Sequence, residues 1–229
     1  MNPLPRADAS RFEPQWHGPS RAWFGEVYPG TVAPVIDVEG VEGKIAGVDA
    51  IQAHDPAFSE AAFLVAVERV FFAVLEAWTT LRPSLAQGVM AAAIFQQLRT
   101  QVLDYQGRGR RNLLEGLRLV SANVAGARSQ GGIDTLTVRI NAESSDYDVE
   151  AASGRILEGD QQLREWTEDW IFQRPSSLST ATPGTVAALT CPACGAAVTV
   201  DVTSICPFCG AAVVSGRFGW LLTRIERVL

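Results

Sequence analysis

The sequence predicts an α+β protein in which helices come first and an antiparallel meander of strands follows, with a small cysteine-bearing module at the C-terminal end. Three observations lead to this prediction. Apolar residues recur at helical spacing between residues 41 and 107, they alternate with period two from Leu117 onwards, and four cysteines form two Cys-x-x-Cys pairs after residue 190. We therefore expect one main domain and a separate metal-binding module.

Three helices are expected in the first half of the chain. The first is short and amphipathic over residues 41–51, although Gly43 and Gly47 weaken it. Helix-start signals at residues 55–60 precede a long helix with an apolar face wide enough to lie across a sheet, formed by Phe63, Leu64, Val67, Val70, Phe71, Val74, Leu75 and Trp78. After a break at residues 81–83, the third helix carries apolar residues at steps of four, which are Met90, Ile94, Leu98 and Val102.

The second half of the chain predicts strands. One face of the first strand is expected to consist of Val120, Ala122 and Val124. A tight turn at Gly131 and Gly132 leads to a second, antiparallel strand with one face formed by Leu136, Val138, Ile140 and Ala142. A further turn at Ser153-Gly154 precedes the last strand, residues 166–174. Residues 176–190 are rich in Ser, Thr, Pro and Gly and are expected to form a linker.

Composition limits the possible functions. The chain has 229 residues, 47% of them hydrophobic, and a formal net charge of −6, which argues against a protein that coats nucleic acid with clustered Lys and Arg. The first thirty residues hold several prolines and no apolar run, so we expect no signal peptide. Residues 61–78 are the most apolar window, but they include charges and are too few to span a bilayer. We expect a cytoplasmic protein.

Residues 1–37 are expected to form an irregular arm, because Pro and Gly interrupt every helical or alternating period. The arm carries scattered aromatic side chains, namely Phe12, Trp16, Trp23, Phe24 and Tyr28. Two interpretations remain open for them. They either lie against the main domain or form a peptide segment that binds a partner.

The four cysteines predict one structural zinc ion, held by Cys191, Cys194, Cys206 and Cys209. Two residues between thiolates let one tight turn aim both sulfur atoms at a common point about 2.3 Å away. Four thiolates complete a tetrahedron and leave no position for water, so the site is structural. The alternatives are a rubredoxin-like iron site, a pair of disulfides and a redox Cys-x-x-Cys. We assign residues 191–229 to a zinc ribbon with a C-terminal tail.

Several residues follow the order and spacing of a known family. They are Asp55-Pro56-Ala57-Phe58-Ser59, Trp78, Leu81-Arg82-Pro83, Tyr105, Gly109-Arg110-Arg111-Asn112, Asp146-Tyr147, Thr167-Glu168, Trp170, Phe172 and Arg174. This pattern resembles the Tim-forty-four-like domain, named after the C-terminal domain of the mitochondrial inner-membrane import-motor anchor, and we place the domain at residues 38–175. The long charged helical region of the mitochondrial members has no counterpart in this sequence, so no import-motor function is expected.

The resemblance implies a cone-shaped nuclear-transport-factor-like (cystatin-like) fold, with helices packed on a curved antiparallel sheet and an apolar pocket between them. It also implies peripheral attachment to membranes or to membrane-bound partners. The function we expect is therefore a non-catalytic binding module or adaptor, attached peripherally to the inner face of the membrane, with a protein or a lipid as its partner. The candidate binding residues are Arg110, Arg111, Trp78, Trp166 and Trp170.

Two other functions stay open. One is a small-molecule enzyme of the cone-fold type that uses Glu168 or Asp169; neighbouring strand residues point to opposite faces, so only one of them can face the interior. Neither histidine, His17 or His54, has a triad partner in view. The other function is nucleic-acid binding through the ribbon or through four arginines, which could instead form local ion pairs: Arg108, Arg110, Arg111 and Arg118.

Overall fold

The computed structural model describes residues 41–180, 188–190, 196–199, 208 and 219–228. The arm and all four cysteines lie outside these residues, so the expectations for the arm, the zinc ion and the ribbon stay predictions.

The order of the elements confirms the α+β prediction. The helices come first and are α1 (Val41–His54), α2 (Glu60–Thr79), the 3-10 helix η3 (Pro83–Ala86) and α3 (Ala92–Gly107). The strands of the main sheet are β1 (Arg110–Leu113), β2 (Arg118–Gln130), β3 (Ile133–Glu150), β4 (Ile156–Pro175) and β7 (Leu221–Arg227). Two short strands pair antiparallel in a separate sheet, β5 (Ala188–Thr190) and β6 (Ala197–Thr199).

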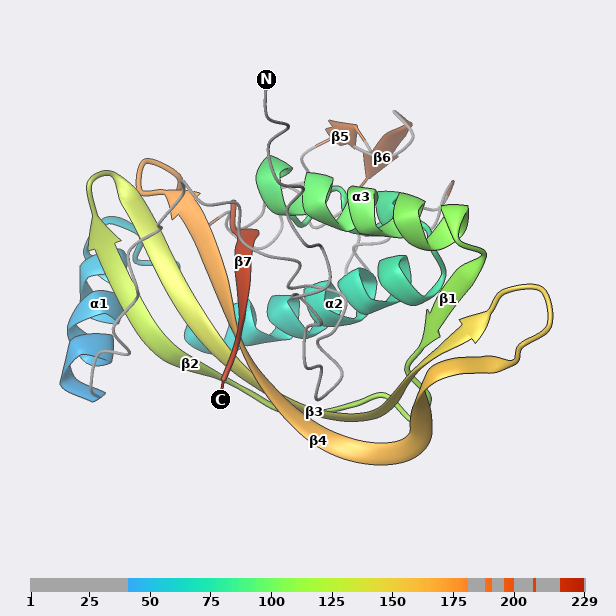
Figure 1. Ribbon diagram of the computed structural model, residues 1–229. Coiled ribbons are helices and arrows are strands. Elements are labelled where there is room, and N and C mark those ends of the chain that lie inside the picture. Colours follow the sequence, from blue (N-terminus) through green and yellow to red (C-terminus); the bar gives the residue numbers. More distant parts are fainter. Residues whose placement is uncertain (1–40, 181–187, 191–195, 200–207, 209–218, 229) are drawn as a thin grey trace, which may run out of the picture.

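Strand β3 organises the main sheet. On one side its first half pairs with β2 and its second half with β1; on the other side it pairs with β4, and every pairing is antiparallel. Strands β3 and β4 curl around α2 and α3, which lie on the concave side, while α1 lies against β2 at one end (Figure 1). This half-barrel agrees with the curved sheet and covering helices that the family resemblance implies.

The C-terminal strand requires a correction. Residues 221–227 were expected in the tail of the ribbon, but they form β7, which pairs with β4 at the edge of the main sheet. The backbone of Leu222 also bonds to residues 89–91, donating to Val89 O (2.9 Å) and accepting from Ala91 N (2.8 Å). The segment between β4 and β7 therefore connects two neighbouring strands of one sheet. Met90, expected on the third helix, lies before α3 and forms a bridge with Leu222.

Two further strand predictions were wrong in detail. Strand β4 starts at Ile156 rather than at residue 166. In β2 an irregularity lies between Leu119 and Ser121, which shifts the alternation of side chains. Val120 is consequently 42% exposed, whereas Leu119 packs against the core together with Ala122 and Val124.

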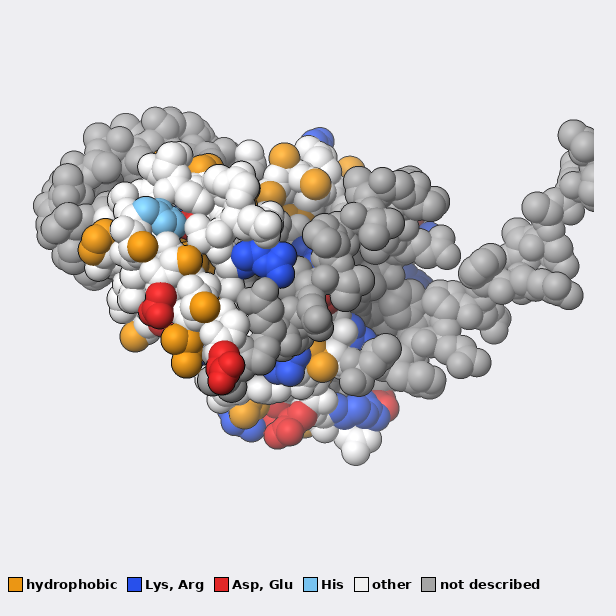
Figure 2. All heavy atoms as spheres, turned by 90° about the vertical axis from the view of Figure 1, so that its left-hand side faces the viewer, with side chains coloured by type: hydrophobic (Ala, Val, Ile, Leu, Met, Phe, Trp, Pro, Cys, Tyr) orange, Lys and Arg blue, Asp and Glu red, His pale blue; other side chains and the backbone are white. Residues whose placement is uncertain are grey.

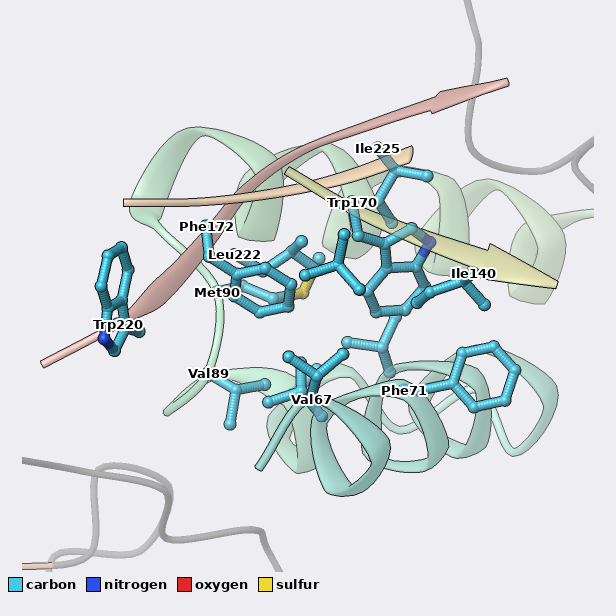
Figure 3. Close-up of a cluster of buried hydrophobic side chains, with 14 of the residues drawn as sticks. Val67, Phe71, Val89, Met90, Ile140, Trp170, Phe172, Trp220, Leu222 and Ile225 are labelled. Carbon is cyan, nitrogen blue, oxygen red and sulfur yellow. The ribbon is translucent and has the colours of Figure 1, made fainter. Parts of the chain in front are cut away.

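The core fills the space between α2 and the sheet. Trp170 and Phe172 of β4, together with Leu222 of β7, lie opposite Val67 and Phe71 of α2 (Figure 3). All five side chains are almost completely buried. The sequence left open which face of β4 looks inward, and the structure shows that the tryptophan face does.

Candidate functional site

Asn112 on β1 is the centre of a first buried polar network. Its Nδ2 donates to Asp146 Oδ1 (2.7 Å) and Asp148 Oδ1 (3.0 Å), and its Oδ1 accepts from Trp78 Nε1 (3.0 Å). The hydroxyl of Tyr105 donates to Asp148 Oδ2 (2.9 Å). Burial and the neighbouring Asp148 carboxylate raise the pKa of Tyr105, so this residue remains a hydrogen-bond donor. The network joins α2, α3, β1 and β3.

The two candidate arginines beside Asn112 have local partners. Arg111 Nε donates to the carbonyl of Thr79 (2.8 Å) at the end of α2, where helix carbonyls lack partners within the helix. Arg110 lies 3.8 Å from Asp148 and 3.9 Å from Glu158. Both arginines therefore fasten the turn between α3 and the sheet to its surroundings. The alternative of local pairing describes them better than a phosphate site does.

The other two arginines of the candidate phosphate site are also paired. Arg108 lies 3.0 Å from Asp104, and Arg118 lies 3.2 Å from Glu143. Among the described residues, the structure thus gives a nearby acceptor to each of the four arginines.

The turn after α2 contains Leu81 and Arg82, two of the residues that carry the family resemblance. The N–H of Arg82 bonds to Ala77 O and that of Leu81 to Trp78 O, a helix ending in which the left-handed residue is usually Gly. Leu81 occupies that position with φ of 57°, and its side chain packs against the core. Gln106 Nε2 donates to the Leu81 carbonyl (3.2 Å). These residues stop the helix and tie it to α3.

Arg174 near the end of β4 is the centre of a second buried network. It is 1% exposed, and its guanidinium lies 2.8 Å from Asp55 Oδ2 and 3.1 Å from Asp134 Oδ2. The ring centroids of Trp220 and Phe58 lie 4.6 and 5.8 Å from its Cζ. A buried cation loses its interactions with water. The two carboxylates and the two aromatic rings compensate Arg174 for that loss.

Asp134 collects further hydrogen bonds. His54 Nε2 lies 3.0 Å from its Oδ2, and the hydroxyls of Ser129 and Ser176 donate to its Oδ1 at 2.8 and 2.9 Å. Burial alone would raise the pKa of Asp134, but the hydrogen bonds from His54, the two serines and Arg174 outweigh burial and lower the pKa. His54, for which the sequence offered no partner, is therefore held by a buried carboxylate.

Asp55 is held from the segment that follows β4. The N–H and the hydroxyl of Thr180 donate to Asp55 Oδ2 at 3.0 and 2.6 Å. Burial would raise the pKa of Asp55, but the bonds from Thr180 and Arg174 outweigh it and lower the pKa. Residues 176–180, expected to be the start of a linker, instead contribute two side chains to this network.

Glu168 faces the core from β4, whereas Asp169 is buried on the opposite face of the sheet and accepts two hydrogen bonds from Arg139. Glu168 is 3% exposed, and its Oε2 accepts from Trp170 Nε1 (2.9 Å). Burial raises the pKa of Glu168 to about 7, although the hydrogen bond from Trp170 and the charge of Arg227 on β7 act in the opposite direction. A carboxyl that exchanges its proton near neutral pH can serve as a general acid or base.

The three candidate tryptophans contribute to the fold. Trp78 and Trp170 are buried in the core, and Trp166 is half-buried with its Nε1 donating to Ser144 Oγ (3.1 Å). Their role in binding a partner stays a prediction.

The zinc ligands predicted at the four cysteines cannot be placed, because these residues lie outside the described part of the chain. Within the described residues, no group of three or more His, Cys, Asp or Glu side chains is arranged to hold a metal ion. No helix in those same residues combines the length and apolar character needed to cross a bilayer.

Comparison with known proteins identifies the domain. The Tim44-like domain matches residues 45–185, which include both polar networks except Trp220. No curated protein matches the chain. Among solved structures, it is similar to the crystal structure of the intermembrane space region of chloroplast protein ARC6, at 11% identity over 68% of this chain and 91% of that chain, with a TM-score of 0.28 that is too low for further argument. Because the family match spans more than half of the sequence, the chain belongs to the Tim44-like domain family.

Proposed function

We propose that the chain is a non-catalytic binding module that works as an adaptor, with its binding surface on the outside of the Tim44-like domain. The observation that carries this proposal is the use of polar residues inside the fold. Asn112 bonds to Asp146 and Asp148, and Arg174 pairs with Asp55 and Asp134, so that each network connects elements that are distant in the sequence. Their hydrogen-bonding capacity supports the fold, so recognition is left to the outer surface.

The proposal includes attachment to a membrane-bound partner or to the membrane itself, as the family resemblance implies. It also includes one structural zinc ion at the four cysteines. Purified protein is expected to carry about one zinc per chain, and Cys194→Ser is expected to release it, because three thiolates no longer close the tetrahedron. Metal analysis of both proteins tests this, and two metals per chain would contradict a single four-thiolate site.

The adaptor proposal is tested with the full chain as bait in its native host. A partner recovered in this way is then purified and mixed with the wild-type chain and with Glu168→Gln. We expect a complex of fixed stoichiometry that both chains form equally well, because Glu168 is buried and cannot touch a partner. Chemical conversion of a bound molecule by the wild type, lost in Glu168→Gln, would overturn the proposal.

The pKa of Glu168 is the observation that favours the second candidate, a small-molecule enzyme. Proton transfer requires the carboxyl to come within hydrogen-bond distance of a substrate. In the structure the carboxyl instead accepts from Trp170, and the residue opposite it on β3 is the buried Ile140. A substrate would have to displace these side chains. The binding function is therefore the better supported of the two.

The apolar pocket implied by the resemblance remains a prediction. The side chains named for its lining, such as Leu136, Val138 and Trp170, are fully buried in the core. A long-chain lipid or detergent that raises the thermal midpoint of the full chain and quenches its tryptophan fluorescence would show that the core opens to an apolar ligand. No response would place the function on the outer surface.

A further inference from the structure

Strand β7 consists of two parts that are held to the domain differently. Its register with β4 shifts between Ile171 and Phe172, so Thr223 has no opposite residue in the ladder and marks the boundary between the parts. In the first part, Leu222 is fully buried and stands opposite Phe172. The backbone of Leu222 also forms two hydrogen bonds with residues 89–91. The first part is therefore anchored along both of its edges.

The second part, residues 224–228, is attached along one edge. Within the described chain its backbone pairs with β4 alone. Ile225 supplies its buried apolar side chain, which is 4% exposed and lies beside Trp170 (Figure 3). The last attachment is the hydrogen bond from the N–H of Val228 to the carbonyl of Thr167, at 3.3 Å. We call residues 224–228 the β7 latch.

The β7 latch lies next to the buried carboxyl of Glu168. Arg227 stands opposite Glu168 in the ladder, and Ile225 stands opposite Trp170. Among the described residues the carboxyl accepts one hydrogen bond, from Trp170 Nε1, and the residue opposite it on β3 is the apolar Ile140. A buried carboxylate requires several donors or a close cation in place of water. The ionised form of Glu168 is therefore poorly stabilised while the latch is closed.

Arg227 is the cation whose charge acts on Glu168, and its own side chain is exposed at the end of β7. Two ion pairs occupy the opposite face of the same strands, Arg139 with Asp169 and Arg224 with Glu226. Charged side chains of the described chain lie mostly at the surface, as Figure 2 shows for the side of α1. Those of α2 and α3 that are exposed are Glu68, Arg69, Glu76, Arg99, Asp104 and Arg108. An exposed cation is screened by water, so it offsets only part of the cost of ionising Glu168.

We propose that the β7 latch opens when Glu168 loses its proton, while Leu222 and the preceding Trp220 keep the first part of β7 in place. Opening at Thr223 gives the carboxylate access to water and gives up the burial of one apolar side chain, Ile225. It uncovers the edge of β4 from Thr167 to Ile171, so the shape of this part of the domain depends on pH. The latch goes beyond the proposed binding function and does not depend on it.

The direction of the pH dependence follows from the two states of Glu168. With the latch closed, burial raises the pKa of Glu168 from its usual 4.5 to about 7. With the latch open, the carboxyl is solvated and returns to its usual pKa. Opening therefore releases a proton between these two pH values. It becomes easier as the pH rises from about 4.5 to about 7, and the effect levels off above that range.

Hydrogen exchange of backbone amides in the full chain, measured at about pH 5 and about pH 8, tests the latch. Protection is expressed relative to an unstructured peptide at the same pH, which removes the pH dependence of the exchange chemistry. We expect the latch amides that bond to β4, among them Val228, to be at least about tenfold less protected than the amide of Leu222. Their protection should fall roughly 70-fold from the lower to the higher pH, as pKa values of 4.5 and about 7 require.

Glu168→Gln should abolish this fall, because Gln stays neutral while its oxygen can still accept from Trp170. Glu165→Gln, which removes the same charge from the exposed part of β4, is the matched control and should behave as the wild type does. Latch amides as protected as Leu222 would overturn the proposal, because β7 would then open only with the whole domain. Protection that stays constant with pH in the wild type, or that still falls in Glu168→Gln, would also overturn it. No partner takes part in this measurement, so its failure is separate from failure of the adaptor proposal.

Discussion

Replacing Glu168 by Gln should make the protein more stable at alkaline pH and leave it nearly unchanged at acidic pH. In the folded chain, burial raises the pKa of Glu168 from its usual 4.5 to about 7. Between these two pH values the folded state keeps a proton that the unfolded state has released. The free energy of unfolding therefore falls as the pH rises from about 4.5 to about 7, and it levels off above that range.

The size of the effect follows from the two pKa values. The difference between 4.5 and about 7 corresponds to about 3 kcal/mol in the free energy of unfolding, and Glu168 is too deeply buried for solvent to screen this loss. For a domain of this size the loss equals roughly 10 °C in the thermal midpoint. The Gln side chain stays neutral and its oxygen can still accept from Trp170. Glu168→Gln should therefore avoid the loss.

Urea unfolding of both proteins at about pH 5 and about pH 8, with a chelator present throughout, measures the effect. The difference between variant and wild type should grow by about 2.5 kcal/mol from the lower to the higher pH, because contributions from all other titrating groups cancel. Glu165→Gln, on the exposed part of the same strand, is the control and should show no such growth. A difference that does not change with pH would refute a buried, proton-holding Glu168.

Three structural changes and one metal removal test the remaining arguments. A chain ending at Thr180 lacks β7 and the preceding Trp220, and so loses the buried side chains of Trp220, Leu222 and Ile225, which contribute about 6 kcal/mol; circular dichroism should show the domain largely unfolded. Arg174→Met should lower the free energy of unfolding in urea by about 3–5 kcal/mol, because it leaves buried carboxylates without their cation. Gly47→Ala should lower the thermal midpoint despite its better helix propensity, because the new Cβ would lie 1.9 Å from the Ala127 carbonyl oxygen. Removal of zinc by a chelator should lower the free energy of unfolding of the domain by less than about 1 kcal/mol, measured in urea.

Periodicity predicted most of the fold because burial itself is periodic. The apolar face of α2 and the alternation along β3 follow from Phe63, Val67, Leu136 and Val138, and the structure buries these residues as expected. The alternation of apolar and polar residues does not indicate where a strand becomes irregular. The irregularity after Leu119 changes the face of the following residues without altering the composition of β2.

The sequence also contains a weaker signal for the Arg174 network, which would have allowed its prediction. Asp134 is in phase with Leu136 on β3, and Arg174 is in phase with Phe172 on β4, so each interrupts an apolar face with a charge. Opposite charges on the inner faces of two paired strands predict a buried ion pair, and the two residues do stand opposite each other in the ladder. The contribution of Thr180 could not be foreseen, because it depends on a chain reversal after β4.

Strand β7 was missed because few residues specify it. Within β7, only Leu222 and Ile225 supply buried apolar side chains to the core. The strand follows the cysteine pairs, which led us to assign the whole region to a zinc ribbon. Its place next to β4 depends on pairing across a long connection, which local pattern cannot reveal.

The position of β7 also determines how strongly the cysteine module can affect the domain. The segment between β4 and β7 is a loop of roughly 45 residues that the pairing of the two strands closes. A zinc ion that ties Cys191 to Cys209 would shorten the effective loop to roughly 27 residues, which changes the closure free energy by only about 0.5 kcal/mol. Burial of Trp220 and Leu222 outweighs that amount several-fold. If the module holds the predicted zinc ion, its removal should therefore leave β7 in place, and a loss of several kcal/mol on chelation would instead mean that the module packs directly on the domain.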